Sequence, residues 1–305
     1  MRLTIEHHTQ YVYSAPVNYT IQQLRLTPQS GFGQHVKYWD IKVQGQLHAF
    51  EDAFGNTTHT LVIDKPHSEL SVTVIGEVET GVNDYTQHQP LPLTIFLRDT
   101  PLTLADEATS TFSAKFKDKP IDDLMHALVD KVGYIKGATK VQTTAIEAFQ
   151  LGQGVCQDHA HVFIACCRSL GYPARYVSGY LFTQDGSLMQ SHAWVDVWFD
   201  SAWQSVDVSN SCRAGETYIR LATGLDYRTA SPVTGMRSGG GVEGMATSVV
   251  VNQANVPIYQ QHKMNQIALL KEAQHVQQQA QLEHQKVQQK AQQALQVQQT
   301  QQSQQ

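Results

Sequence analysis

The period of the hydrophobic residues changes part-way along the chain, and this change limits the folds that are open to it. Up to about residue 88, β-branched and aromatic residues alternate with polar ones, and Gly55-Asn56 marks a tight turn. From about Thr103 onward, apolar residues recur three and four positions apart, which is typical of amphipathic helices. The sequence therefore predicts an α+β protein in which an antiparallel β domain precedes a mixed core.

Four segments follow from these patterns. We expect an N-terminal β domain over residues 1–88 and a proline-containing linker over residues 89–103. Residues 104–254 are expected to form the core, including its C-terminal strands. Residues 255–305 are mostly glutamine and lack the apolar side chains that a separate core would need, so they are interpreted as a low-complexity tail.

Composition excludes several classes of protein. The formal net charge is −5, so no basic surface for nucleic acid is expected. The N-terminal residues MRLTIEHHTQYVYS lack the apolar segment of a signal peptide, and no apolar run is long enough to span a membrane. Four cysteines in 305 residues are too few for a disulfide framework. We therefore expect a cytoplasmic protein without a membrane or nucleic-acid partner, and its oligomeric state stays open.

The segment CQDHAHVFIACCRSLGYP gives the strongest helix prediction. Gly171 and Pro173 are residues that typically end a helix. The turn Gly152-Gln153-Gly154 comes just before the segment, so it would deliver Cys156 to the start of the helix. One apolar stripe has helical spacing and consists of Ala160, Phe163, Ile164, Cys167 and Leu170.

Cys156 is the candidate nucleophile. Unpaired backbone N–H groups and the helix dipole at a helix N-terminus make a thiol there ionise more readily. Its own backbone N–H can also face an acyl oxygen that develops negative charge. An intracellular cysteine is more often a small buried hydrophobe, and we assign that role to Cys166 and Cys167. Cys212 is expected to be a loop thiol.

His192 and Asp207 are the candidate base and orienting group. They lie on two successive predicted strands, HAWVDVWF and AWQSVDVS. A tight turn at Asp200-Ser201 would pair these strands as a hairpin and bring the two side chains within diagonal reach. The carboxylate would then fix the imidazole tautomer while the other ring nitrogen faces the thiol. Asp196 alternates with valines and is expected to face solvent.

A metal site is the alternative for this region. Cys156 and His159 form a Cys-x-x-His pair, but a closed zinc site needs four ligands and no second pair has suitable spacing. We therefore expect neither a metal nor another cofactor. Asp158 is expected to complement the dipole of the helix, and His161 to be a solvated or hydrogen-bonded helix residue.

The segments GQGVCQDHAHVFIACCRSLGYPARYVSGYLF, SHAWVDVWF and AWQSVDVSN resemble the transglutaminase-like core. That core shares the papain-like arrangement in which a helix carries the cysteine and strands carry the histidine and aspartate. The N-terminal stretches YVYSAPV, LRLTP and DAFGN are similar to the β domain that precedes this core in bacterial transglutaminase-like proteins. The resemblance covers about residues 1–251.

The resemblance implies that Cys156 is the nucleophile, His192 the base and Asp207 the orienting group. Two positions depart from the family: DVSN replaces a more usual proline and threonine, and His159 replaces a more usual aromatic residue. No tryptophan precedes Cys156 in the oxyanion-stabilising position that one occupies in animal transglutaminases. Gln150 or Gln153 is the predicted substitute.

The implied chemistry is acyl transfer from a peptide or protein substrate through a thioester. If water resolves the thioester, the enzyme is a protease or amidase, and if an amine does so it is a transglutaminase. We expect hydrolysis, because amine transfer needs a bound amine and a site that excludes water. A non-catalytic interaction module is the third alternative, against which the presence of all three groups argues.

Overall fold

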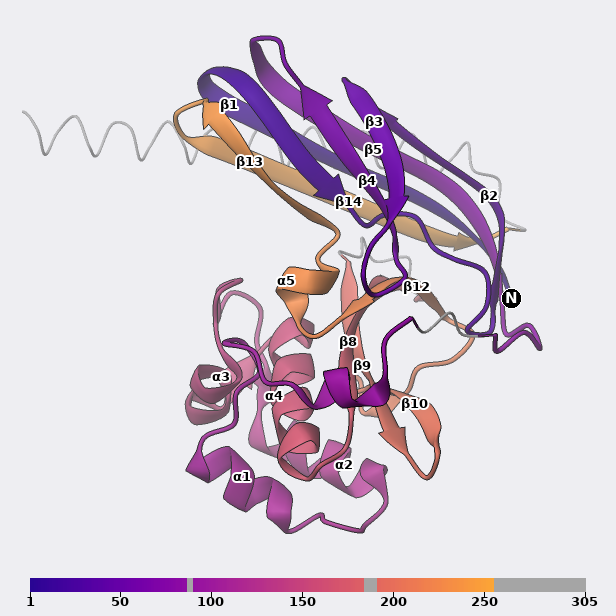
Figure 1. Ribbon diagram of the computed structural model, residues 1–305, viewed down its shortest axis with the longest axis vertical. Helices are drawn as coiled ribbons and strands as arrows, with labels where there is room; N and C mark the ends of the chain where they lie inside the picture. Colours follow the sequence, from indigo (N-terminus) through magenta and orange to yellow (C-terminus); the bar gives the residue numbers. More distant parts are fainter. Residues whose placement is uncertain (87–89, 184–190, 255–305) are drawn as a thin grey trace, which may run out of the picture.

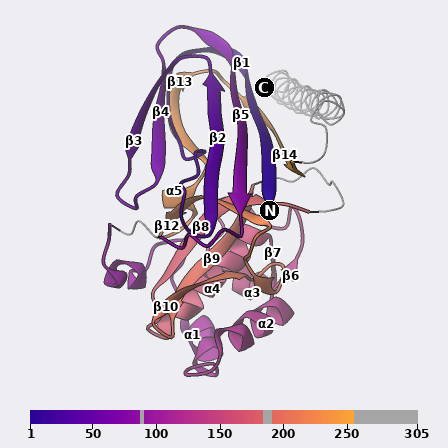
Figure 2. The same cartoon turned by 90° about the vertical axis from the view of Figure 1, so that its right-hand side faces the viewer.

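The computed structural model describes residues 1–86, 90–183 and 191–254, so the predicted glutamine-rich tail lies outside the described residues. A β domain is stacked on one end of a core in which helices cover an antiparallel sheet (Figures 1 and 2). The predicted α+β class is confirmed. Within the described ranges, no helix has the length and apolar character needed to cross a membrane.

The β domain is built around one long strand, β1. The first half of β1 lies between β5 and β14, and its second half lies between β4 and β13. The pairing with β5 shifts register between Val12 and Val17, where the strand passes from one set of partners to the other. The strands of this sheet are β1 (Arg2–Leu24), β2 (Gln34–Val43), β3 (Gln46–Glu51), β4 (Thr57–Ile63), β5 (His67–Thr80), β13 (Val233–Gly239) and β14 (Glu243–Gln253).

The last two strands belong to the β domain, whereas the sequence assigned them to the core. β13 and β14 pair antiparallel with β1, and Val249 and Val251 of β14 join the same hydrophobic cluster as Leu3 and Ile5. An alternating pattern identifies a strand but does not identify its partner, so the sequence could not place these two. The expected linker is also folded in part: it contains the 3-10 helix η1 (Leu93–Leu97), whose Phe96 is buried.

The core contains a five-stranded sheet with the order β11-β10-β9-β8-β12. Asp106 and Pro120 are the N-cap residues of the first two helices, α1 and α2. The elements are α1 (Glu107–Ala114), α2 (Ile121–Lys131), β6 (Gly133–Tyr134), α3 (Ala145–Leu151), β7 (Gln153–Gly154), α4 (Cys156–Ser169), β8 (Ala174–Leu181), β9 (His192–Phe199), β10 (Ala202–Asp207), β11 (Cys212–Arg213), β12 (Tyr218–Gly224) and α5 (Tyr227–Ala230).

Helix α4 is buried on all sides, although the sequence predicted a single apolar stripe. Every side chain from Asp158 to Arg168 is buried. Phe163 and Ile164 share a hydrophobic cluster with Val195 and Val197 of β9. Helices α1, α2 and α3 contact the rest of α4, so polar residues of the helix are enclosed as well (Figure 1).

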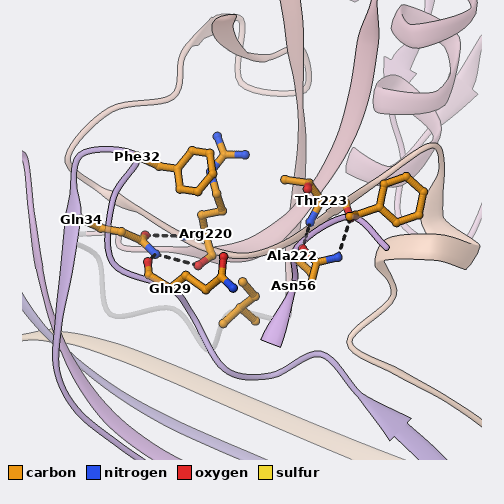
Figure 3. A pocket seen from close by; sticks show the side chains of 9 residues that line it. Gln29, Phe32, Gln34, Asn56, Arg220, Ala222 and Thr223 are labelled. Atoms are coloured by element: carbon orange, nitrogen blue, oxygen red, sulfur yellow. Dashed lines mark hydrogen bonds between the residues drawn. The ribbon is translucent and has the colours of Figure 1, made fainter. Parts of the chain in front are cut away.

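Two side-chain amides of the β domain bind the free edge of the core sheet (Figure 3). The Asn56 amide donates to the Thr223 carbonyl at 2.8 Å and accepts from the Thr223 N–H at 2.8 Å. Gln34 makes the same pair of contacts with Arg220 at 3.0 and 2.9 Å. Each amide satisfies backbone groups that an edge strand otherwise leaves unpaired.

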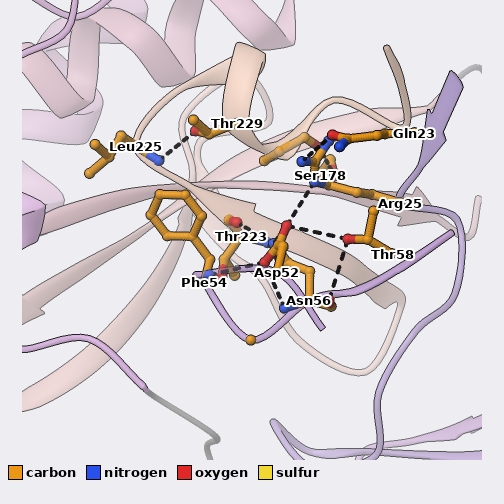
Figure 4. A network of polar contacts seen from close by, with 12 residues as sticks. Gln23, Arg25, Asp52, Phe54, Asn56, Thr58, Ser178, Thr223, Leu225 and Thr229 are labelled. Atoms are coloured by element: carbon orange, nitrogen blue, oxygen red, sulfur yellow. Dashed lines mark hydrogen bonds and ion pairs between the residues drawn. The ribbon is translucent and has the colours of Figure 1, made fainter. Parts of the chain in front are cut away.

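The turn predicted at Gly55-Asn56 is the loop that makes one of these contacts (Figure 4). Asp52 holds the loop, since its Oδ1 accepts from the N–H groups of Phe54 and Asn56, each at 3.0 Å. Its Oδ2 accepts from Arg25 Nε at 2.9 Å. Gly55 has a positive φ of 81°, which favours glycine at that point of the turn.

Asp196 is completely buried, so the expectation that it faces solvent is wrong. Arg175 Nε and Arg220 Nη1 donate to its Oδ2 at 2.8 and 2.7 Å, and Ser205 donates to its Oδ1 at 2.7 Å. Burial would raise the pKa of Asp196, but Arg220 and Arg175 hold it well below its ordinary value. The alternation assumed one solvated face of the sheet, whereas Phe32 of the β domain covers this face.

Replacing Asn56 with alanine should destabilise the protein by about 1–3 kcal/mol, because it leaves the Thr223 N–H and carbonyl buried without partners. Urea denaturation measures the change in unfolding free energy. Asn18→Ala is the matched control, since Asn18 is exposed on β1. Equal stability of the two variants would contradict this role for Asn56.

Candidate active site

The two glycines of the Gly152-Gln153-Gly154 turn place Cys156 at the start of α4 for different reasons. Gly152 ends α3 with a positive φ of 67°. At Gly154 a Cβ atom would lie 2.5 Å from the Cβ of Asp158, so only glycine fits there. Asp158 in turn accepts from the Val155 N–H at 2.8 Å and from the Thr139 hydroxyl, which fixes the entry into the helix.

Cys156 is the first residue of α4 and is half-buried. Its backbone N–H has no intrahelical acceptor at this position, which is general for the first turn of a helix. Val155, the N-cap residue, has no side-chain acceptor that could cap this turn. The N–H groups beside the Cys156 sulfur are therefore available to a negatively charged group.

His192 and Asp207 meet where β9 begins and the neighbouring strand β10 ends. His192 Nε2 lies 2.6 Å from Asp207 Oδ2, and the two side chains are 8% and 0% exposed. The predicted hairpin is confirmed: Phe199 pairs with Ala202, and the turn residues Asp200 and Ser201 both have positive φ. Such a turn suits the twist of a two-residue hairpin.

The electrostatics of the site favour a protonated imidazole. Burial would lower the pKa of His192, but hydrogen bonds to Asp207 and Cys156, together with their charges, raise it to about 10. Burial would raise the pKa of Asp207, but His192, Tyr218 and Asn210 lower it to about 2. With Nε2 held by Asp207, Nδ1 is the ring nitrogen left to exchange a proton with the thiol.

Other groups that bind the Asp207 carboxylate were missed by sequence reasoning. Ser209 donates to Oδ1 at 2.8 Å, and the Asn210 amide donates to Oδ2 at 2.7 Å. Both residues belong to the DVSN stretch that departs from the family. Their hydrogen-bond donors, so close to Asp207 in the sequence, could have identified them. Tyr218 also donates to Oδ2 at 2.7 Å, but it lies on a different strand and no local pattern points to it.

Aromatic rings flank both sides of the site. Trp194 stacks on His192 with ring centroids 6.3 Å apart. Tyr134 is about half exposed and stacks on His159 at 6.1 Å. Its strand β6 pairs with β7 so that Tyr134 lies opposite Gly154, two residues before Cys156. Partial burial and the charges of Cys156 and Asp207 raise the pKa of Tyr134.

The other three cysteines lie in different surroundings. Cys166 and Cys167 are completely buried in the core cluster, which confirms their packing role, and burial raises the pKa of Cys166 to about 12. Cys212 is not in a loop, because it begins β11 and pairs with Asp207. Its Sγ lies 3.3 Å from the hydroxyl of Tyr218.

The predicted oxyanion donors have different positions. The Gln150 amide donates to Asp106 at 3.2 Å on the exposed side of α3, so that donor is already engaged away from the cysteine. Gln153 lies in β7, three residues before Cys156, and its role stays a prediction.

The histidines and the acid on α4 have structural partners. His159 Nδ1 and Nε2 lie 2.9 and 2.8 Å from the carbonyls of Val155 and Val132, so the Cys-x-x-His pair does not converge. His161 is buried and accepts from the Tyr227 N–H at 3.1 Å. Asp158 lies in the first turn, as expected.

The papain-like fold class is defined by a cysteine at the N-terminus of a buried helix that lies against a buried histidine–aspartate pair on an antiparallel sheet. The chain belongs to the transglutaminase-like superfamily within that class. Residues 3–79 match the model of the bacterial transglutaminase-like N-terminal region, and residues 103–208 match that of the transglutaminase-like superfamily.

The chain is also similar to individual proteins from other organisms. An uncharacterised protein of Mycobacterium leprae is 29% identical over 276 residues, covering 83% of this chain and 99% of the relative. An uncharacterised protein of Mycobacterium tuberculosis is 25% identical over 273 residues, covering 77% and 87%. The crystal structure of a candidate cysteine protease from Cytophaga hutchinsonii aligns with a TM-score of 0.69 at 20% identity, covering 84% of this chain and 92% of that one.

Iodoacetamide should alkylate Cys156 rapidly near neutral pH, because His192 can accept its proton. Cys166 and Cys167 should react slowly, since both are buried and burial raises the pKa of each thiol. Site-resolved mass spectrometry of the alkylated peptides measures the rates. His192→Ala should slow the labelling of Cys156, and equal rates for all four cysteines would contradict the site.

Asp207→Asn should lower the pKa of His192 from about 10, because the imidazolium loses its negatively charged partner. The ratio of Cys156 alkylation rates by iodoacetate and iodoacetamide reports this, since only the anionic reagent is attracted to the imidazolium. The pH at which the ratio falls should move downward. Asp122→Asn, which removes an exposed carboxylate beside Arg213, is the control and should leave it unchanged.

Proposed function

We propose that this protein is an enzyme that transfers the acyl group of a peptide or carboxamide bond to Cys156 and then to water. The observation that supports this is the buried contact of His192 with Asp207 at 2.6 Å, next to a cysteine at a helix N-terminus. A nucleophile, a base and an orienting acid are the groups that thioester chemistry requires.

In the first half of the reaction, the thiolate of Cys156, whose proton His192 already holds, attacks the carbonyl carbon of the substrate. The carbonyl electrons move to oxygen, and the Cys156 N–H donates to that oxyanion. The imidazolium then gives its proton to the leaving amine as the C–N bond breaks, which leaves a thioester. Gln153 and Tyr134, on the paired strands β7 and β6, are our proposed sources of the second oxyanion donor.

In the second half, His192 takes a proton from water, and the resulting nucleophile attacks the thioester. The carboxylic acid product leaves, which frees the Cys156 thiolate, and the proton taken from water stays on His192. Asp207 stays ionised throughout, since its pKa of about 2 lies far below neutral pH. Its part is to stabilise the imidazolium formed in each half of the reaction.

We propose hydrolysis ahead of amine transfer because water can reach a half-buried cysteine without a dedicated binding site. The protein from Cytophaga hutchinsonii is described as a candidate cysteine protease, which supports the same choice. Transglutamination of a glutamine substrate is the alternative. We also propose a cytoplasmic location, which the four unpaired cysteines support.

A glutamine-containing peptide library incubated with the protein, with and without a primary amine, should give deamidated or cleaved products in both cases. Mass spectrometry identifies the products and any acyl group trapped on Cys156. Cys156→Ser should abolish turnover, whereas Cys166→Ala, which truncates a buried thiol on the same helix, should retain it.

Amine incorporation in place of hydrolysis would support the transglutaminase alternative. The absence of any acyl adduct or product across the library would favour an interaction module and would overturn the proposed function.

A further inference from the structure

Two groups outside the Cys156, His192 and Asp207 set form a chain of hydrogen bonds that ends on the catalytic carboxylate. The Tyr218 hydroxyl lies 2.7 Å from Asp207 Oδ2, the same oxygen that contacts His192 Nε2. The Cys212 sulfur lies 3.3 Å from that hydroxyl. The mechanism described above uses neither residue.

The topology of the sheet explains how these residues come together. Cys212 begins β11 and pairs with Asp207, the last residue of β10. Tyr218 begins β12, which lies at the opposite end of the strand order. The short connection between Cys212 and Tyr218 therefore crosses the sheet beside the catalytic pair.

The direction of each hydrogen bond follows from its chemistry. An ionised carboxylate only accepts, so Tyr218 donates its single proton to Asp207. The remaining contact must then run from the Cys212 thiol to the Tyr218 oxygen. Burial and the charge of Asp207 raise the pKa of Tyr218, so the phenol keeps its proton.

We propose that Tyr218 is a positioning residue that withdraws charge from the Asp207 oxygen facing His192, and that Cys212 holds the Tyr218 hydroxyl in place. The proposal rests on the proposed function. Ser209 and Asn210 already fix the orientation of the carboxylate, so the hydroxyl is not needed for that purpose. The Tyr218 hydroxyl instead weakens the attraction between Asp207 and the His192 imidazolium. The imidazolium can then release its proton to the leaving amine.

The Tyr218 ring and its hydroxyl can be separated experimentally. The ring packs against Trp194 with centroids 5.3 Å apart and against His192 at 6.0 Å. Tyr218→Phe keeps these ring contacts and removes the hydroxyl, and with it the bond to Asp207 and the bond from Cys212. The titratable groups near His192 are Cys156 on α4, Asp207 on β10, Tyr134 on β6 and Tyr218 on β12.

The test measures the charge on His192 through the ratio of Cys156 alkylation rates by iodoacetate and iodoacetamide across a pH series. In Tyr218→Phe, the pH at which this ratio falls should move upward, because Asp207 then attracts the imidazolium more strongly. The matched control is Tyr172→Phe, which loses a phenol that accepts from the Asp118 N–H, and it should match the parent protein.

Cys212 gives a second pair of variants. Cys212→Ser keeps a donor to Tyr218 and should preserve the profile of the parent protein, whereas Cys212→Ala should move it upward by less than Tyr218→Phe does. Thermal unfolding of all four variants shows whether a shift has a structural cause.

An unchanged or lowered midpoint in Tyr218→Phe, with Cys156 still reacting rapidly, overturns the role of Tyr218 alone. Slow alkylation of Cys156 in the parent protein would instead overturn the proposed function.

Discussion

The site depends on the enclosure of helix α4, because a helix buried on all sides cannot rotate or slide relative to the sheet beneath it. Its hydrophobic contacts with β9 hold the first residue of the helix, Cys156, against the first residue of the strand, His192. Helix α4 and strand β9, which β8 separates in the sequence, are thus held in a fixed arrangement. The proposed chemistry depends on this packing of α4 against β9 more than on any single loop.

The core sheet is covered on both faces, and the second cover links the β domain to the candidate active site. One face packs on α4, while Phe32 lies over the Arg175–Asp196–Arg220 ion pairs on the other. Asp196 and His192 both lie on β9, so the β domain stabilises the strand that carries His192. Because β13 and β14 pair with β1, the core segment lies, in the sequence, between two parts of the same sheet.

Local patterns in the sequence were enough to place Cys156, His192 and the Asp200-Ser201 turn, because helix starts and hairpin registers follow from neighbouring residues. They did not reveal the burial of Asp196, since its arginine partners and its cover come from distant segments. The role of the Asn56 turn and the destination of β13 and β14 depend on contacts across more than a hundred residues. Tyr218 reaches Asp207 only because the chain crosses the sheet, and strand periodicity carries no information about that crossing.

The central claim is that His192 accepts the proton of Cys156, and the ultraviolet absorbance of the thiolate tests it most directly. Subtracting the spectrum of Cys156→Ser from that of the parent protein isolates this one sulfur. The account predicts a positive thiolate difference at neutral pH that is lost when the same subtraction is made in a His192→Ala background. A difference that appears only at alkaline pH, or that is unaffected by His192→Ala, would contradict it.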